Sequence, residues 1–258
     1  MKIYDCFGFN DENHLLEIRL NELDKYVDYF VVVEFGETHQ GNKKTQNIDK
    51  DLINKYRNKI RYYYVDKFEN IKDPHGRDQY QRNYLSNGLY DADNNDLILL
   101  SDIDEIPNLK KIEIDQVGNN IFAFSQVHSM YKLNLCLEKK WIGSKICKFQ
   151  NLKSLQWLRS LRTKRYSLLR IDKLFSPRYS RNIKIIENAG WHFGWLRTSE
   201  SIIKKLESYA HSEHNTNYFK NKNLIDQCIN EKKNFFNKNE ILKISSLNEL
   251  PLYIQKNF

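Results

Sequence analysis

The chain has 258 residues, with 41 Lys and Arg against 33 Asp and Glu and a formal net charge of +8 at pH 7. Hydrophobic residues make up 40% of it and Gly and Pro are few (9 and 4), which excludes disordered, collagen-like and linker-dominated architectures. The cysteines lack zinc-site spacing, and the sequence has neither a signal-peptide core nor the ~20-residue apolar run of a membrane-spanning helix, so we expect a cytoplasmic protein with reduced thiols.

Short β-rich runs alternate with helical patterns through the first half of the chain. Strands are predicted over residues 29–34, 60–65, 96–101 and 121–125, and helices over residues 12–27, with Asp11 as N-cap, and 77–90. Strands that alternate with helices form βαβ units, so the pattern predicts an α/β fold with a mainly parallel sheet flanked by helices. We expect a single domain over residues 1–258, with one half at about 1–110 and the other at about 111–258.

Positive charge is concentrated in residues 139–184, called the basic block below, which contain 14 Lys or Arg and one acid. The rest of the chain carries 27 basic and 32 acidic residues and is net negative. Within residues 152–175, Leu155, Leu158 and Leu161 recur every three positions among arginines, an imperfect basic amphipathic pattern. The block predicts either peripheral contact with a membrane, aided by shallow insertion of its Leu and Trp side chains, or a cradle for an acidic acceptor. A solvated helix face is the alternative, and nucleic acid is disfavoured because no nucleic-acid motif is present.

A strand, an aromatic loop and two helices are predicted after the basic block. The strand covers residues 183–187, the loop is Gly190-Trp191-His192-Phe193-Gly194-Trp195, and the helices cover residues 198–210 and 222–236. His192 lies between two glycines and two tryptophans, a pattern that favours a loop.

The sharpest chemical signal is an apolar strand that ends in the carboxylates of Asp102, Asp104 and Glu105, after which Pro107 prevents the strand from continuing. Three acids at one strand end repel each other unless a cation lies near them. Hard divalent ions prefer carboxylate oxygens together with substrate phosphates, and the carboxyl end of a parallel strand is where open α/β sheets bind ligands. This D-x-D motif therefore predicts a Mn²⁺ or Mg²⁺ site, with solvated acids that cap the next helix as the alternative.

Two enzyme classes place D-x-D after an apolar strand. One is the phosphatase-like fold, whose aspartyl nucleophile normally lies on the first strand and is followed by Thr or Val. The other is the nucleotide-sugar transferase with a metal-bound diphosphate. Several β units precede the motif in this chain and Glu105 follows the second Asp, so position and neighbours favour the transferase.

Longer sequence segments on both sides of the motif support this interpretation. They are Tyr4-Asp5-Cys6-Phe7-Gly8-Phe9-Asn10, Leu15-Leu16-Glu17-Ile18-Arg19-Leu20-Asn21-Glu22-Leu23, Val31-Val32-Val33-Glu34 with Thr38 and Gly41, Ser101-Asp102-Ile103-Asp104-Glu105-Ile106-Pro107, and Ala189-Gly190-Trp191-His192 continuing through Trp195 to Lys205-Leu206. In these blocks, which span most of residues 3–210, the sequence resembles glycosyltransferase family 17, the family of the β-1,4-mannosyl-glycoprotein β-1,4-N-acetylglucosaminyltransferases.

The resemblance implies a GT-A-like, Rossmann-type fold, a UDP-sugar donor, with UDP-GlcNAc first, and inversion at the anomeric carbon. Asp104 is then expected as the first metal ligand, and Asp102 as a second ligand or a partner of the ribose or of water. His192 is expected to complete the metal site, with a packed structural imidazole as the alternative. Trp191 and Trp195 are expected to stack on sugar faces, with core packing as the alternative.

The nucleotide is expected to meet the same sheet edge and the helix before the D-x-D strand. Glu34 ends a Val-rich strand and is a candidate acceptor for ribose hydroxyls or the uracil N–H, and Thr38 lies in the loop beyond it. Arg77, Arg82 and Asn83 are candidates for the nucleotide-sugar, because the fork of an Arg matches phosphate oxygens. Exposed helix residues without such a role are the alternative.

An inverting transfer needs a general base that deprotonates the acceptor hydroxyl. The candidates are Glu105, Glu187 and Glu213, with Glu105 first because it lies beside the metal motif. The whole pattern predicts a metal-dependent UDP-sugar transferase that acts on a glycan or lipid-linked glycan in surface polysaccharide or glycoconjugate synthesis, at the cytoplasmic membrane face. The first half of the chain would bind the donor and the second the acceptor. Another UDP-hexose as donor, or a non-catalytic basic protein that binds a membrane surface or nucleic acid, are the alternatives.

A membrane role for the basic block predicts the effect of replacing four of its basic residues. Replacing Arg159, Arg162, Lys164 and Arg165 by Ser is expected to abolish binding to anionic liposomes. Donor hydrolysis should be nearly unchanged, because the metal motif lies on another segment of the chain.

Overall fold

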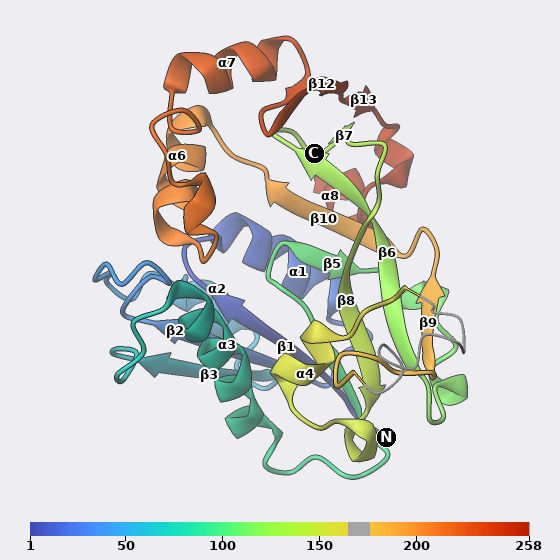
Figure 1. Ribbon diagram of the computed structural model, residues 1–258. Helices are drawn as coiled ribbons and strands as arrows, with labels where there is room; N and C mark the ends of the chain where they lie inside the picture. The colour runs from blue at the N-terminus through green and yellow to red at the C-terminus, as the bar shows by residue number, and fades with distance from the viewer. Residues whose placement is uncertain (165–175, 258) are drawn as a thin grey trace.

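The computed structural model describes residues 1–164 and 176–257 (Figure 1). The strands are β1 (Ile3–Phe9), β2 (Tyr29–Phe35), β3 (Ile60–Val65), β4 (Leu97–Leu100), β5 (Glu105–Pro107), β6 (Ile121–Met130), β7 (Leu135–Cys136), β8 (Trp141–Lys148), β9 (Ile183–Ile186), β10 (Gly190–Trp195), β11 (Lys233–Asn234), β12 (Asn237–Ile241) and β13 (Lys243–Ile244). The helices are α1 (Asn13–Leu23), α2 (Lys50–Lys55), α3 (Pro74–Tyr84), α4 (Leu155–Ser160), α6 (Ser199–Ser208), α7 (Lys222–Asn230) and α8 (Leu252–Asn257).

The large sheet runs in the order β13-β7-β6-β8-β4-β1-β2-β3, with β9 and β10 paired to β6 and β5 paired to β10. Strands β3, β2, β1 and β4 are parallel, and β8 pairs antiparallel with both β4 and β6. The parallel part follows the chain as βα units that α1, α2 and α3 connect. The predicted α/β fold, with a mainly parallel sheet flanked by helices, is therefore confirmed.

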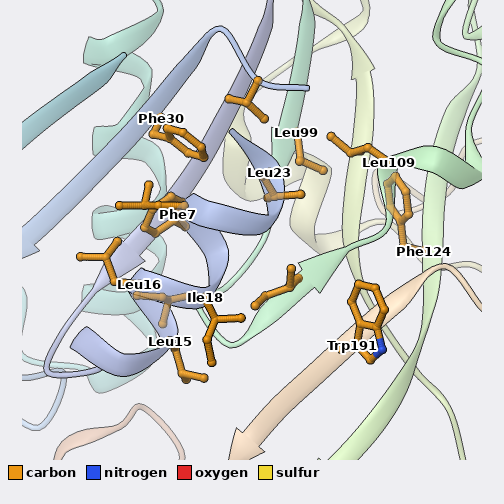
Figure 2. Packing of buried hydrophobic residues seen from close by; sticks show 14 of the residues in the cluster. Phe7, Leu15, Leu16, Ile18, Leu23, Phe30, Leu99, Leu109, Phe124 and Trp191 are labelled. Atoms are coloured by element: carbon orange, nitrogen blue, oxygen red, sulfur yellow. The ribbon is translucent and has the colours of Figure 1, made fainter. Parts of the chain in front are cut away.

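Strands β1, β2 and β4 are buried on both faces, because helices cover each side of the sheet (Figure 1). On one face α1 packs its Leu16 against Phe7 and Phe30 (Figure 2). On the other face Cys6 belongs to a cluster with Leu158 of α4. A third cluster joins β10 to α6 and α7, so the core holds the strand ends and the C-terminal helices in one body.

The predicted element boundaries shift in several places. Helix α1 begins after Glu12, whose side chain makes no capping hydrogen bond, and not after Asp11. Helix α3 begins earlier than predicted, with Asp73 as its N-cap, and ends at Tyr84 in a 3₁₀ turn. The predicted strand over 121–125 continues through β6, and the predicted helix over 222–236 ends at Asn230 before a small hairpin. No helix in residues 1–164 and 176–257 has both the length and the apolar character needed to cross a bilayer.

The aromatic run predicted as a loop is the buried strand β10. It lies between β5, to which it is antiparallel, and β6, to which it is parallel. Gly190 has a φ of +137°, and a Cβ at this position would collide with the carbonyl oxygen of Ile106. The glycine therefore marks the close approach of two strands and not a loop. The pairing places His192 opposite Glu105.

Candidate active site

A cavity of about 590 Å³ opens at the carboxyl ends of β1, β2 and β4. Its wall also includes parts of α3, α4, β6, β8, β10 and α6, so both halves of the chain contribute to it. The charged side chains and imidazoles that line it are Glu12, Glu37, His39, Lys44, Asp78, Arg82, Asp102, Asp104, His128, Arg159, His192, Lys205, His211 and His214. This is the edge at which open α/β sheets bind their ligands.

Asp104 is buried in the cavity wall between a lysine and an imidazole. Its Oδ2 accepts a hydrogen bond from Nζ of Lys205 at 2.9 Å, and its Oδ1 lies 3.6 Å from Nε2 of His192. Burial by itself would raise the pKa of Asp104, but Lys205 and His192 outweigh this effect and hold the pKa well below its usual value. Asp104 is therefore a charged carboxylate at neutral pH that faces the cavity.

Asp102 faces two arginines. Its Oδ2 accepts from Nη2 of Arg159 at 2.5 Å and its Oδ1 from Nη2 of Arg82 at 3.3 Å. Arg82 is itself held by Asp78, one turn earlier on α3, at 2.7 Å. Burial opposes ionisation of Asp102, and the charges of Arg159 and Arg82 lower its pKa. The acids of the D-x-D motif are thus each matched by cations of the chain itself.

Glu105, the first candidate for the general base, is fully buried behind the cavity. Its Oε1 accepts from Nε1 of Trp141 at 2.6 Å, and its Oε2 accepts from Nη1 of Arg159 at 2.9 Å and from the backbone N–H of Asp102 at 3.2 Å. Both oxygens are occupied, so direct contact with an acceptor hydroxyl does not fit this placement. Glu105 instead holds two cavity side chains in position.

Two residues without a predicted role stack on His192. The rings of Trp141 and His192 have centroids 4.5 Å apart, and those of His192 and His128 are 4.4 Å apart. Burial, and next the neighbouring His192, lowers the pKa of His128 to about 3, so His128 is neutral. Within the described parts of the chain, Nε2 of His128 and Nδ1 of His192 are buried without a hydrogen-bond partner. Such groups in a cavity wall are available to a ligand.

Part of the predicted set is brought together here. The predicted residues that line the cavity are Thr38, Arg82, Asp102, Asp104, His192 and Trp195. They come from the loop after β2, from α3, from the D-x-D motif and from β10, so the structure joins the metal candidates to one Arg and one Thr of the predicted nucleotide set.

Glu34 lies outside the cavity lining and is fully buried. Its Oε1 accepts from Nζ of Lys44 at 2.6 Å and from the backbone N–H of Asn47 at 3.0 Å, while its Oε2 accepts from the hydroxyl of Tyr62 at 2.7 Å. Direct contact with ribose or uracil does not fit this placement. Glu34 orients Lys44, which does line the cavity.

Arg77 and Asn83 lie on α3 but outside the cavity lining. Nη1 of Arg77 donates to the carbonyl of His39 at 2.9 Å, so this side chain supports the loop after β2. Oδ1 of Asn83 accepts from the backbone N–H of Gln156 at 2.9 Å and ties α3 to α4. Both residues contact neighbouring backbone, and their role at the nucleotide-sugar stays a prediction.

Trp191 is a core residue, because its ring lies in the cluster around α1 (Figure 2) and its Nε1 donates to the carbonyl of Glu249 at 2.5 Å. Its predicted sugar contact does not fit this burial, whereas Trp195 reaches the cavity. Glu187 is exposed beyond the end of β9. Glu213 is exposed beside His211, which lines the cavity, and it stays a predicted base at the cavity mouth.

The basic block is used partly inside the protein. Leu155, Leu158 and Leu161 are buried in the core, so their predicted insertion into a membrane is wrong. Arg159 lies in the cavity wall against the D-x-D carboxylates, so the reason for expecting that its replacement spares donor hydrolysis, a metal motif on another segment, does not hold. Arg165, the last of the four residues in that expectation, lies outside the described residues.

Lys145 of β8 gives the first testable prediction, because burial, and next the charge of Arg159, lowers its pKa to about 8. A folded-state pKa below the unfolded value means that the unfolded chain binds more protons between the two values, so stability rises with pH in this window. Urea unfolding from pH 7.5 to 9.5 should show this rise, which approaches about 1.4 kcal/mol per pH unit above the folded-state pKa. The Lys145→Met variant should lack it, and parallel profiles for both proteins would contradict the prediction.

The residues present fit a divalent cation at the D-x-D motif. Asp104 and His192 lie at a separation too long for a good hydrogen bond and suited to two ligands of one ion, and carboxylate oxygen with imidazole nitrogen is a donor set that Mn²⁺ accepts. Asp102 points toward its arginines and would reach the ion through water or after leaving them. Two protein ligands suffice where substrate phosphates supply others.

Comparison with known proteins places the chain in a family. The curated relatives that it resembles include the beta-1,4-mannosyl-glycoprotein 4-beta-N-acetylglucosaminyltransferases of Rattus norvegicus (28% identity) and Homo sapiens (27%), each in an alignment of 234 positions that covers 80% of this chain. The alignments cover 42% and 43% of the relatives, so the chain spans less than half of their length.

A solved glycosyltransferase involved in the glycosylation of the major capsid of PBCV-1 is a distant structural neighbour. Its TM-score is 0.37 at 11% identity, over 72% of this chain and 82% of that one. The sequence profile of the family described as glycosyltransferase family 17 matches residues 1–240, which is most of the chain. The chain therefore belongs to glycosyltransferase family 17.

Proposed function

We propose that the chain is a metal-dependent, inverting glycosyltransferase that moves a sugar, with GlcNAc as the first candidate, from a UDP-sugar to a glycan acceptor. The observation that supports this most directly is the cavity wall at the D-x-D motif. There Asp104 and His192 face each other, and cationic side chains of Arg82, Lys44 and Lys205 line the same space. Side chains that can bind a metal ion thus lie beside cationic side chains that can bind phosphate. This combination suits the diphosphate group of a nucleotide-sugar.

Each part of the donor then has a proposed partner. Asp104 and His192 would hold Mn²⁺ or Mg²⁺, which when bound neutralises the diphosphate so that UDP leaves without taking a full proton. Arg82 would present its guanidinium to phosphate oxygens, and Lys205, whose Nζ lies against Asp104, would contact phosphate beside the metal ligands. Trp195 offers a ring face to a sugar.

The test is a thermal-shift panel of nucleotide-sugars with and without Mn²⁺. A ligand that binds only the native state at 100 times its Kd stabilises the protein by about 2.7 kcal/mol. UDP-GlcNAc with Mn²⁺ should raise the melting temperature more than UDP-GlcNAc with EDTA or GDP-mannose with Mn²⁺, and UDP should then be released in an acceptor assay. A larger shift with another UDP-hexose would change the donor sugar. Equal shifts with all nucleotides, or stabilisation by polynucleotide alone, would contradict the proposal.

A lipid-linked glycan on an anionic bilayer is the proposed setting of the acceptor. Arg162 and Arg178 lie together, since the backbone N–H of Arg162 donates to the carbonyl of Arg178, and both side chains are exposed, as is that of Arg181. Each such charge near an anionic surface contributes about 1 kcal/mol. Binding to anionic liposomes should weaken with salt and be lost when these three arginines become Ser, while UDP-GlcNAc hydrolysis is unchanged. No binding at low salt would exclude the membrane and leave a soluble acceptor.

A further inference from the structure

A second group of metal-ligand side chains lies at the cavity mouth, away from the D-x-D motif. It consists of His75 near the start of α3 and of His211 and Glu213 in the segment 209–214 after α6. One ligand atom from each residue lies within 4.8 Å of the others, and all three side chains are exposed. Within the described parts of the chain, these three residues form the one His, Cys, Asp and Glu group with this proximity.

The distances within the group are already close to those of a metal site. Nδ1 of His211 lies 2.7 Å from Oε1 of Glu213, and the rings of His75 and His211 meet edge to face with centroids 5.2 Å apart. Zinc bonds of about 2.0–2.2 Å in a tetrahedral site place ligand atoms roughly 3.3–3.5 Å apart. Exposed side chains can close the remaining gap by rotation alone, without movement of the core.

The ligand chemistry separates this group from the D-x-D site. Two imidazoles with one carboxylate suit Zn²⁺ and similar divalent ions, whereas Mg²⁺ prefers oxygen ligands. No residue is shared with Asp104 or His192, and the four cysteines, which would otherwise compete for zinc, are all buried. We propose that His75, His211 and Glu213 form a second metal site, for Zn²⁺ or a similar ion, that fastens the segment 209–214 to the start of α3 across the cavity mouth.

The position of the group indicates what an ion bound there would do. Tyr209, Ala210 and His211 line the cavity, so the segment 209–214 forms part of its mouth. One existing contact already joins this segment to the nucleotide side, because Nε2 of Gln40 donates to the carbonyl of Tyr209 at 2.7 Å. A metal bridge from His211 to His75 adds a second attachment, between elements that are more than a hundred positions apart in sequence. The bound ion thus restrains the rim of the donor cavity.

Zinc binding by the whole, untagged chain tests this site without any substrate. After EDTA treatment and its removal, isothermal titration with ZnCl₂ should show one tight site, and zinc should raise the melting temperature. His75→Ala and His211→Ala should each weaken this binding about tenfold or more and remove the thermal shift, since loss of even a supporting contact to a metal site costs 10–100-fold. His75→Gln, which preserves side-chain bulk, should behave like His75→Ala.

Two matched variants distinguish zinc binding at this site from zinc binding elsewhere on the protein. His14→Ala removes an exposed imidazole on α1 and should bind zinc like the wild type. Asp104→Asn removes the proposed Mn²⁺ ligand and should also retain the zinc site, so failure of the glycosyltransferase proposal and failure of this one give different results. The proposal is overturned if the wild type binds no zinc, if His75→Ala binds it unchanged, or if the binding disappears in Asp104→Asn.

Discussion

Replacing Asp104 by Asn should lower sugar transfer by at least about 10²–10³-fold, the usual cost of removing one group that stabilises transition-state charge. It should also remove the Mn²⁺-dependent part of UDP-sugar binding. The reason is positional: the Asp104 carboxylate is held charged beside His192, so the variant loses the anionic ligand and keeps the shape. Calorimetric titration of UDP with and without Mn²⁺, together with a UDP-release assay, measures both effects.

The control for this variant is Asp115→Asn, which removes an exposed carboxylate elsewhere and should change neither measurement. The fold of Asp104→Asn should survive, because Lys205 keeps its second hydrogen bond, to the carbonyl of Gly194 at 2.6 Å. Unfolding curves check this point. If the folded Asp104→Asn variant transferred sugar at the wild-type rate with undiminished Mn²⁺ dependence, Asp104 would not be a metal ligand.

The sequence predicted those parts of the site that depend on local pattern. A buried four-residue strand followed by Asp102 and Asp104 can be located without tertiary information, because parallel strands end at one edge of the sheet. Thr38 follows from the same edge argument, and Arg82 from its place on the helix before that strand. Helices α1 and α3 and strands β2, β3 and β4 were also predictable, because short β-rich runs differ clearly from helical spacing, whereas helix α2 was not predicted.

The partners of these acids were not predictable, because distant parts of the chain supply them. Lys205 is 101 positions from Asp104, and it is one of several polar residues on α6 that local sequence does not distinguish. Arg159 is 57 positions from Asp102, and nothing in the local sequence separates it from the many other basic residues of the basic block. Local pattern does not distinguish a buried Arg from an exposed one until the acids that it pairs with are placed.

Proximity in sequence to a motif also misled the assignment of roles. Glu105 follows Asp104 directly, yet Asp104 lies in the turn before β5 and Glu105 is the first residue of that strand. Asp104 faces the cavity while Glu105 turns toward Arg159 and Trp141 behind it. In β10, the alternation of side chains along a strand separates Trp191, which packs in the core, from His192, which lines the cavity. Strand pairing, and not residue type, decides which member of each pair reaches the ligand.

Arg159 should therefore be among the most sensitive residues of the protein. It bridges Asp102 and Glu105, and Glu105 is fully buried. Arg159→Met keeps an unbranched apolar stem and leaves Glu105 without its cationic partner, and breaking a buried ion pair on one side costs about 3–5 kcal/mol. Urea unfolding should show this loss. UDP-sugar affinity should fall as well, because Asp102 loses the partner that sets its direction.

The exposed Arg162, in the same basic segment, provides the matched control. Arg162→Met removes the same charge and should stay within about 0.5 kcal/mol of the wild type, as surface substitutions usually do. The double variant Arg159→Met with Glu105→Gln should recover part of the lost stability, because it no longer buries an unpaired charge. Its donor affinity should stay low, since Asp102 still lacks its contact with Arg159. Equal effects of Arg159→Met and Arg162→Met would show instead that only the net charge of the block matters, and would place the function of Arg159 at the protein surface.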